Sequence, residues 1–94
     1  MGNREFQKLC INTLINYYNK VYDVTGKAPI SESDVFVVWY CKTLQNHKAL
    51  LSTTIPDGMY YEFTYNGDDR ELFMDEYKKW NNVCYNVDDY KYDE

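Results

Sequence analysis

Apolar residues recur every three or four positions between residues 3 and 26. The stripe consists of Phe6, Cys10, Leu14, Tyr18 and Val21, with Leu9, Ile15 and Tyr22 beside it. This spacing places the apolar side chains on one face of an amphipathic helix. Gly26 and Pro29, which act as stop signals, follow soon after. The pattern predicts an N-terminal helix that buries one face.

A run of β-branched and aromatic residues follows in the segment SESDVFVVWYCKTL, residues 31–44. Such residues are enriched in strands, so the run predicts a strand that is covered on much of both faces. In a regular strand one face carries Val35, Val37, Trp39 and Cys41, and the other carries Phe36, Val38 and Tyr40. Residues 45–48 (QNHK) are then expected to form a turn, and residues 48–54 (KALLSTT) a second strand.

Two turn signals bracket the expected third strand, MYYEFTY, residues 59–65. Residues 56–58 (PDG) combine a Pro that presets φ, an Asp that caps the turn and a Gly that tolerates positive φ. Residues 66–67 (NG) are a strong hairpin signal. They predict a short fourth strand around residues 71–74 (ELFM).

The C-terminal part of the chain is expected to form a second, shorter helix and a tail. Asp75 is a suitable N-cap for a helix over residues 75–85, DEYKKWNNVCY, in which Tyr77, Trp80, Val83 and Cys84 share one side. Residues 86–94 (NVDDYKYDE) form an acidic segment whose charges favour a disordered tail. We therefore expect a single domain over residues 1–85 and a tail over residues 86–94.

The order of these elements predicts an α+β fold. It is a small antiparallel β-meander of three to four strands with an N-terminal helix and a shorter C-terminal helix, in the order α-β-β-β-β-α. Such a meander needs no long crossover, so both helices are expected on one face. That face is expected to carry Met59, Tyr61, Phe63 and Tyr65, and the outer face Tyr60, Glu62 and Thr64, joined by Tyr40 and Lys42. Both Trp39 and Trp80 are expected to be largely buried.

Composition and charge narrow the range of functions. The 94 residues are 45% hydrophobic and 18% aromatic, which is too apolar for a disordered chain and sufficient for one modest core. Eleven Tyr residues suit a small core and a contact surface alike. The formal net charge of -5 argues against binding to nucleic acid or to an anionic membrane, because both require clustered Lys and Arg.

Cysteine and histidine usage gives no reason to expect a cofactor or a metal. Cys10, Cys41 and Cys84 are an odd, widely spaced set, which we interpret as reduced, small buried hydrophobes in a cytoplasm. His47 is the only His, and it is expected to be an exposed turn residue. Zinc sites use paired ligands at short spacings, and Cys41 in an apolar strand is a poor nucleophile for His47 to activate. We therefore expect a protein that is not an enzyme.

The central half of the chain resembles a known family. The segments VVWYCKTLQNHKALLSTT, DGMYYEFTYNG and DEYKKW, within residues 34–80, resemble a domain of unknown function found in small proteins of phages and prophages of Gram-positive bacteria. The resemblance implies a protein made in the bacterial cytoplasm during phage growth or lysogeny. It implies no activity or site.

The expected function is therefore contact with another protein. The first hypothesis is an inhibitor or modulator of a host nucleic-acid-handling or defence protein, of the anti-CRISPR or anti-restriction type, in which carboxylates replace phosphates. The alternatives are an accessory subunit in phage replication or assembly and a single-stranded nucleic-acid-binding module. A homodimer, formed through a sheet edge or a Tyr-rich face, is compatible with each of these functions. The expected partner-binding residues are Tyr60, Glu62, Asp68, Asp69 and Tyr40.

Overall fold

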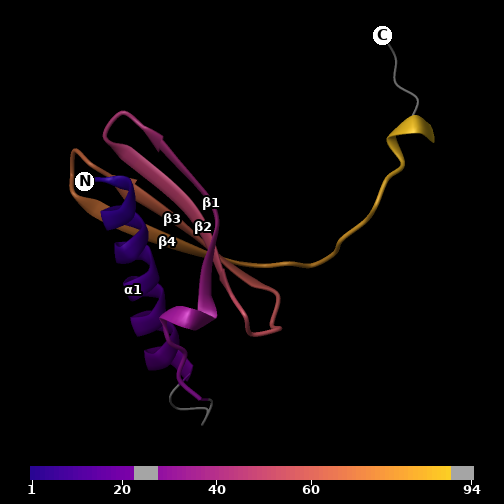
Figure 1. Ribbon diagram of the computed structural model, residues 1–94, viewed down its shortest axis with the longest axis horizontal. Helices are drawn as coiled ribbons and strands as arrows, with labels where there is room; N and C mark the ends of the chain where they lie inside the picture. Colours follow the sequence, from indigo (N-terminus) through magenta and orange to yellow (C-terminus); the bar gives the residue numbers. More distant parts are fainter. Residues whose placement is uncertain (23–27, 90–94) are drawn as a thin grey trace.

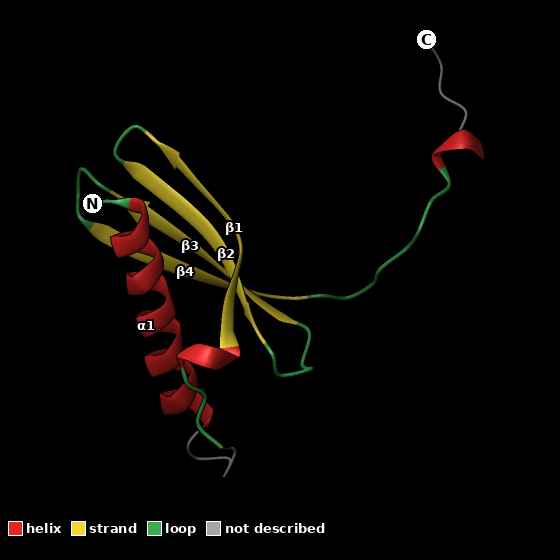
Figure 2. Ribbon diagram, viewed as in Figure 1, coloured by secondary structure: helices red, strands yellow, loops and turns green. Residues whose placement is uncertain are grey.

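The structure is a computed structural model that describes residues 1–22 and 28–89, and it places one helix against one face of a four-stranded sheet (Figures 1 and 2). The sheet is antiparallel throughout, and its strands lie side by side in sequence order, β1-β2-β3-β4. The expected α+β meander is therefore present with its N-terminal helix, but the described residues contain no C-terminal α-helix. The elements are α1 (Asn3–Tyr22), the 3-10 turn η2 (Glu32–Asp34), β1 (Val35–Thr43), β2 (Asn46–Thr53), β3 (Met59–Asn66), β4 (Glu71–Lys78) and the 3-10 turn η3 (Val87–Asp89).

Helix α1 buries the apolar stripe that the sequence predicts. Phe6, Cys10, Leu14 and Tyr18 succeed one another at intervals of four residues, and all four are buried. Val21, the last member of the predicted stripe, is exposed. The helix ends at Tyr22, and the predicted continuation to residue 26 lies outside the described residues.

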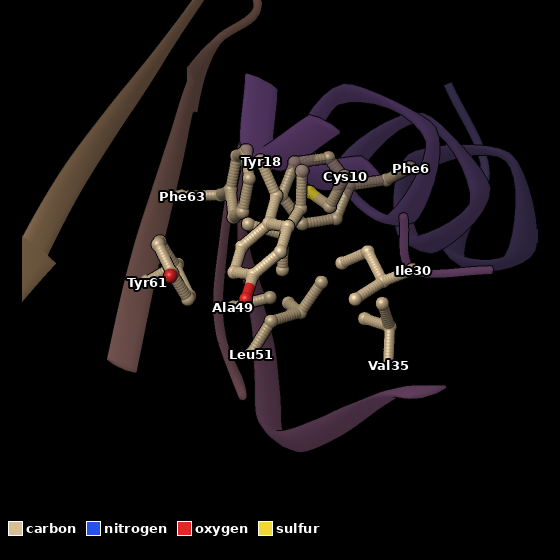
Figure 3. Close-up of a cluster of buried hydrophobic side chains, with 10 residues drawn as sticks. Phe6, Cys10, Tyr18, Ile30, Val35, Ala49, Leu51, Tyr61 and Phe63 are labelled. Atoms are coloured by element: carbon tan, nitrogen blue, oxygen red, sulfur yellow. The ribbon is translucent and has the colours of Figure 1, made fainter. Parts of the chain in front are cut away.

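The core lies between α1 and the inner face of the sheet (Figure 3). Ala49 and Leu51 of β2 and Tyr61 and Phe63 of β3 are fully buried beneath the helix. The predicted inner face of β3 is therefore confirmed, with Met59 and Tyr65 half-buried at the margins of the same core. Its outer face carries the alternate residues Tyr60, Glu62 and Thr64, also as predicted.

A β-bulge in β1 overturns two of the predicted orientations. The register between β1 and β2 shifts between Val37 and Trp39, so that Val37 lies opposite Leu51 and Trp39 opposite Leu50. An inserted residue exchanges the two faces of a strand from that point onward. Trp39 therefore lies on the outer face and is 40% exposed, where we predicted burial, and Tyr40 lies on the inner face.

The same shift moves Cys41 and Lys42. Cys41 pairs with Lys48 on the outer face and is exposed, so the interpretation of Cys41 as a buried hydrophobe is wrong. Lys42 pairs with His47 and so lies on the inner side of the sheet, whereas we predicted that it would join the outer face. Only Cys10 among the three cysteines is buried, since Cys84 is also exposed.

The first hairpin is tighter than predicted. The turn consists of residues 44–45 alone, with Leu44 at a φ of 56°, and β2 already begins at Asn46. His47 is therefore a strand residue that is only 2% exposed, and its prediction as an exposed turn residue is wrong. The QNHK segment contains turn-forming residues, but cross-strand pairing continues through most of it.

The other two turns follow their signals more closely. In the β2–β3 turn, Asp57 Oδ1 accepts a hydrogen bond from the Met59 backbone N–H at 3.0 Å, and Gly58 has a φ of 72°. In the β3–β4 turn, the Asn66 side chain accepts a hydrogen bond from the Asp68 backbone N–H at 3.1 Å. The loop of this hairpin spans residues 67–70 and is longer than the two residues that its Asn-Gly signal favours.

The predicted helix over residues 75–85 is absent. Strand β4 pairs with β3 as far as Lys78, opposite Met59, and the Lys79 backbone N–H then donates to the Gly58 carbonyl at 2.7 Å. Cross-strand pairing wins because β3 presents a strand edge from Asn66 to Met59, and residues 71–78 pair with it along its whole length. Trp80, predicted to be buried on this helix, is 93% exposed.

Residues 79–89 form what we call the C-terminal arm. Residues 79–86 have no regular secondary structure, and η3 (Val87–Asp89) follows them. The arm runs away from the sheet, opposite the side on which α1 lies in this view (Figure 1). Of the predicted tail, residues 90–94 lie outside the described residues.

Candidate functional site

The outer face of the sheet is the surface opposite α1, and no helix of the described residues covers it (Figure 2). The pairing register arranges its side chains in rows across the four strands. The first row, at the end where the arm begins, is Phe36, Ser52, Tyr60 and Tyr77; the second is Trp39, Leu50, Glu62 and Asp75; the third is Cys41, Lys48, Thr64 and Phe73. This register places an aromatic residue in every row.

Several of these aromatic side chains are accessible. Phe36 is 47% exposed, and Phe73 and Tyr77 are each 52% exposed. Together with Trp39 they place four large rings on one uncovered face of a small domain. Exposed apolar side chains that are scattered singly need no explanation, but a group on one face is typical of a contact surface.

Two shallow hollows lie on the outer face. One, of about 360 Å³, is lined by Leu50, Tyr60, Tyr77, Lys78 and Lys79, at the root of the arm. The other, of about 390 Å³, lies toward the opposite end and is lined by Cys41, Thr43, Asn46, Lys48, Thr64, Tyr65, Asn66 and Phe73. The first is bordered by rings and Lys side chains, and the second by more polar groups. Both suit the side chains of another protein.

The charged groups of the outer face are few and partly paired. Lys48 Nζ lies 3.6 Å from Glu62 Oε1 across the β2–β3 pair. Asp75 lies opposite Glu62 on β4, and Glu71 begins the same strand. These three carboxylates surround Lys48 on the face of the sheet, and Lys78 and Lys79 border the hollow at the root of the arm, so the face carries no large excess of positive charge.

The predicted partner-binding residues do not form one cluster. Tyr60 and Glu62 lie on the outer face, as expected. Asp68 and Asp69 lie on the β3–β4 loop beyond the end of the sheet, where Asn66 Nδ2 donates to Asp69 Oδ2 at 3.1 Å. Tyr40 lies on the inner face, because of the bulge in β1.

Four exposed aromatic residues of the outer face were not among the predicted partner-binding residues: Phe36, Trp39, Phe73 and Tyr77. The sequence gives no period-two signal for Phe73 and Tyr77, because residues 71–77 (ELFMDEY) contain three consecutive apolar residues and two consecutive acidic ones. Nothing in the period-two pattern of β1 indicates where the bulge falls. The orientation of Trp39 therefore required the pairing register.

His47 lies in an aromatic cluster on the inner face of the sheet, at the end where the β1–β2 turn lies. Tyr40 Oη and His47 Nδ1 are 2.8 Å apart, and the His47 ring centroid lies 4.9 Å from that of Phe6 and 5.9 Å from that of Tyr65. Burial of the ring, and then the positive charge of Lys42, lower the pKa of His47. We interpret the cluster as a structural one, since Cys41 faces the other side of the sheet.

The low pKa of His47 gives stability a dependence on pH. In the unfolded chain the ring titrates near its ordinary pKa of about 6.5, and in the folded protein below it. Between these two pKa values the unfolded state binds more protons, so lowering the pH from about 7 should decrease the free energy of unfolding. Urea denaturation at several pH values from about 7 downward measures the free energy of unfolding at each pH.

The matched variant for this prediction is His47→Asn, whose side-chain oxygen can still accept a hydrogen bond from Tyr40. The variant should lose less free energy of unfolding than the parent over the same pH interval, because it has no group to protonate there. Equal losses in the two proteins would show that other groups cause the acid sensitivity.

The Cys10 thiol is buried in the core beneath α1. Burial raises the pKa of the Cys10 thiol to about 12, which makes it a poor nucleophile. Within residues 1–22 and 28–89, no three side chains of His, Cys, Asp or Glu gather as metal ligands would. In the same part of the chain, no helix has both the length and the apolar character needed to cross a membrane.

Residues 7–87 match a family of unknown function, DUF6275. No curated protein and no solved structure matches the chain. The matched range includes α1 from Gln7 onward, the whole sheet and the arm as far as Val87.

Proposed function

Since the chain belongs to DUF6275, a family with no assigned function, we propose from the geometry that it is a non-catalytic binding module that contacts another protein through the outer face of its sheet. The observation that carries the proposal is the group of exposed rings on this face, at Phe36, Trp39, Phe73 and Tyr77. Rings of this kind are enriched in the buried centres of protein interfaces.

The rest of the face suits a specific contact. Tyr60 and Glu62 lie between the exposed rings, and the ion pair of Glu62 with Lys48 can be rearranged by an incoming charged group. Tyr supplies a rigid ring with a hydroxyl at low entropic cost, and charged groups fix the orientation of a partner. The two hollows provide recesses into which partner side chains can insert.

A host nucleic-acid-handling or defence protein is the partner class that we favour, and the protein then acts as a phage or prophage inhibitor in the bacterial cytoplasm. This part rests on the sequence resemblance described above and on the acidic character of the chain. Glu62 and Asp75 face outward from the sheet, and Asp68 and Asp69 lie beyond its end, so carboxylates border the aromatic surface. Such carboxylates can occupy positions that phosphates take in a basic cleft.

A single-stranded nucleic-acid-binding module is the rival suggested by rings on an uncovered sheet. Stacking of bases on such rings requires an electropositive groove as well. Here Glu62, Asp75 and Glu71 offset Lys48 and the two Lys residues at the root of the arm, so the face forms no electropositive groove. The charge therefore favours a protein partner, either of the host or, as an accessory subunit, of the phage replication or assembly machinery.

The test is affinity capture from bacterial lysate with the double variant Tyr60→Ala/Glu62→Lys. We expect the variant to keep the parent's circular dichroism spectrum and to lose the specifically captured protein. A capture experiment with and without phage infection separates a host partner from a phage one.

The matched control is Glu5→Lys/Asn12→Ala, which makes the same change of charge on the exposed side of α1. This control should capture the same protein as the parent. Loss of capture with the helix variant and not with the sheet variant would move the functional surface to α1 and contradict the proposal.

A further inference from the structure

The C-terminal arm carries apolar side chains that no other part of residues 1–22 and 28–89 covers. Trp80 is 93% exposed, and Val83, Tyr85 and Val87 are also exposed. The hydrogen bond from the Lys79 backbone N–H to the Gly58 carbonyl fixes the root of the arm. A segment of nine residues with four large apolar side chains in water is unusual unless another surface covers it.

The sequence of the arm suits an extended chain laid on a surface. Val83, Tyr85 and Val87 alternate with Cys84 and Asn86, so an extended backbone points the three apolar residues to one side. Residues 79–87 also contain one Lys and no acidic residue, in a chain with a net charge of -5. This part of the arm, which ends before Asp88 and Asp89, is thus less acidic than the rest of the chain.

The outer face of the sheet has the complementary properties. It is aromatic in the first row, at Phe36, Tyr60 and Tyr77, and the hollow beside this row is lined by Leu50, Tyr60 and Tyr77 together with Lys78 and Lys79. The arm begins beside this row, because Lys79 borders the hollow that Tyr60 and Tyr77 line. Every copy of the chain therefore carries two complementary parts at one end of its sheet. One is the aromatic first row, and the other is the apolar arm, which can cover such a row.

The length and direction of the arm favour a second copy as the source of that surface. Nine extended residues span about 30 Å, comparable to the length of a strand of this sheet. The arm leads away from its own sheet and not back across it (Figure 1). Contacts in which each copy gives and receives the same element are closed by a two-fold axis, which is the commonest symmetry of soluble oligomers.

We propose that two copies of the chain associate by exchanging arms, so that residues 79–87 of each lie on the first aromatic row of the other's outer face. Trp80 and Tyr85 are the anchoring side chains, and the hollow lined by Leu50, Tyr60 and Tyr77 receives one of them. The inference rests on the proposed function of the outer face and names one occupant of it. The second and third rows, with Trp39 and Phe73, are left for a different protein.

The area available is adequate for such a dimer. A buried aromatic side chain contributes about 150–250 Å². Two exchanged arms bring two such side chains each, and cover several rings on the sheets that receive them. The total is of the order of the roughly 1,600 Å² of a typical specific interface. The family match also continues through the arm to residue 87, so the arm is part of the unit that defines the family.

The first measurement follows Trp80 directly in the variant Trp39→Phe, in which it is the only Trp. The purified full-length variant should be a dimer by light scattering. Its Trp emission should be blue-shifted at high concentration and shift to the red on dilution, as the dimer dissociates. A monomer with solvent-exposed Trp80 at high concentration overturns the inference. A monomer with blue-shifted emission that is independent of concentration also overturns it, because the arm then lies on its own sheet.

The second measurement compares three substitutions in the otherwise unchanged chain. Trp80→Ser on the arm and Tyr77→Ser on the outer face should each weaken dimerisation at least tenfold. Leu44→Ser, which removes an 81% exposed side chain from the β1–β2 turn, should leave it unchanged. All three side chains are largely exposed, so circular dichroism should confirm that each variant folds. A dimer that tolerates Trp80→Ser, or one that tolerates Tyr77→Ser, contradicts the exchange.

Mixing the arm variant with the face variant tests reciprocity. One of the two arm contacts is intact in a mixed pair, so dimers should reappear on mixing; their absence contradicts a two-fold exchange. These experiments use the purified chain alone. A monomer would overturn the exchange and leave capture of another protein by the outer face intact, whereas a dimer that captures nothing from lysate would overturn the proposed function alone.

Discussion

The substitution Phe63→Ala is expected to lower the free energy of unfolding by about 3–5 kcal/mol. Phe63 is fully buried at the centre of the inner face, under the stripe of α1 that includes Cys10 and Leu14 (Figure 3). Removal of the ring leaves a cavity that a small core cannot refill. Since small domains are stabilised by only about 5–15 kcal/mol in total, much of the stability is lost. Urea denaturation followed by circular dichroism measures the change.

Trp39→Ala is the control for this prediction. The two side chains come from strands of the same sheet, but Trp39 lies on the outer face and is 40% exposed. Its truncation should therefore cost clearly less than that of Phe63, despite the larger ring. The opposite order of costs would mean that the helix covers the other face of the sheet.

Gly67→Ala is expected to lower the free energy of unfolding by about 1–3 kcal/mol. A Cβ atom on Gly67 would lie 2.3 Å from the carbonyl oxygen of Gln45, which belongs to the backbone of the neighbouring turn. The two hairpin turns would have to separate. This would also strain the hydrogen bond of 3.2 Å from the Gly67 backbone N–H to Asn46 Oδ1.

Thermal unfolding is a sensitive readout for Gly67→Ala. A loss of 1 kcal/mol shifts the melting temperature of a domain of this size by about 4–8 °C. Gly2→Ala is the control, because a Cβ at Gly2 meets nothing within 4 Å, and it should leave the melting temperature unchanged. Equal melting temperatures for the two variants would show that the two turns are not in contact.

The sequence pattern predicts the parts of the fold in which local and tertiary preferences agree. The stripe from Phe6 to Tyr18 has a helical period and is buried as a helix face. The alternation of residues 59–65 likewise places Tyr61 and Phe63 inward and Tyr60 outward. In both segments one periodicity accounts for the fully buried residues, so the pattern identifies the face that packs in the core.

The pattern fails where pairing between strands decides the outcome. Residues 75–85 contain a cap and a helical apolar spacing, but β3 offers a strand edge that takes residues 75–78 into the sheet. The apolar residues beyond Lys78 are then left on the arm. The bulge after Val37 is equally a property of the β1–β2 pair, and it alone decides that Trp39 faces outward and Tyr40 inward.

Only some residues of the candidate site could be predicted from the sequence. Tyr60 and Glu62 follow from alternation within one strand, which needs no knowledge of the neighbouring strands. Phe36, Trp39 and Tyr77 join them only through the register of β1 and β4 with their neighbours. Acidic residues in turns, such as Asp68 and Asp69, cannot be assigned to a face from the sequence, because the loop geometry decides where they point.

Hydroxyl-radical footprinting of the protein, free and bound to its captured partner, tests the central claim most directly. Accessible aromatic side chains react, and a bound partner protects those that it covers. We expect protection of the third-row and second-row rings of the outer face, Phe73 and Trp39, with no change on the exposed side of α1. Protection of the α1 surface, with Phe73 and Trp39 as reactive as in the free protein, would contradict the account.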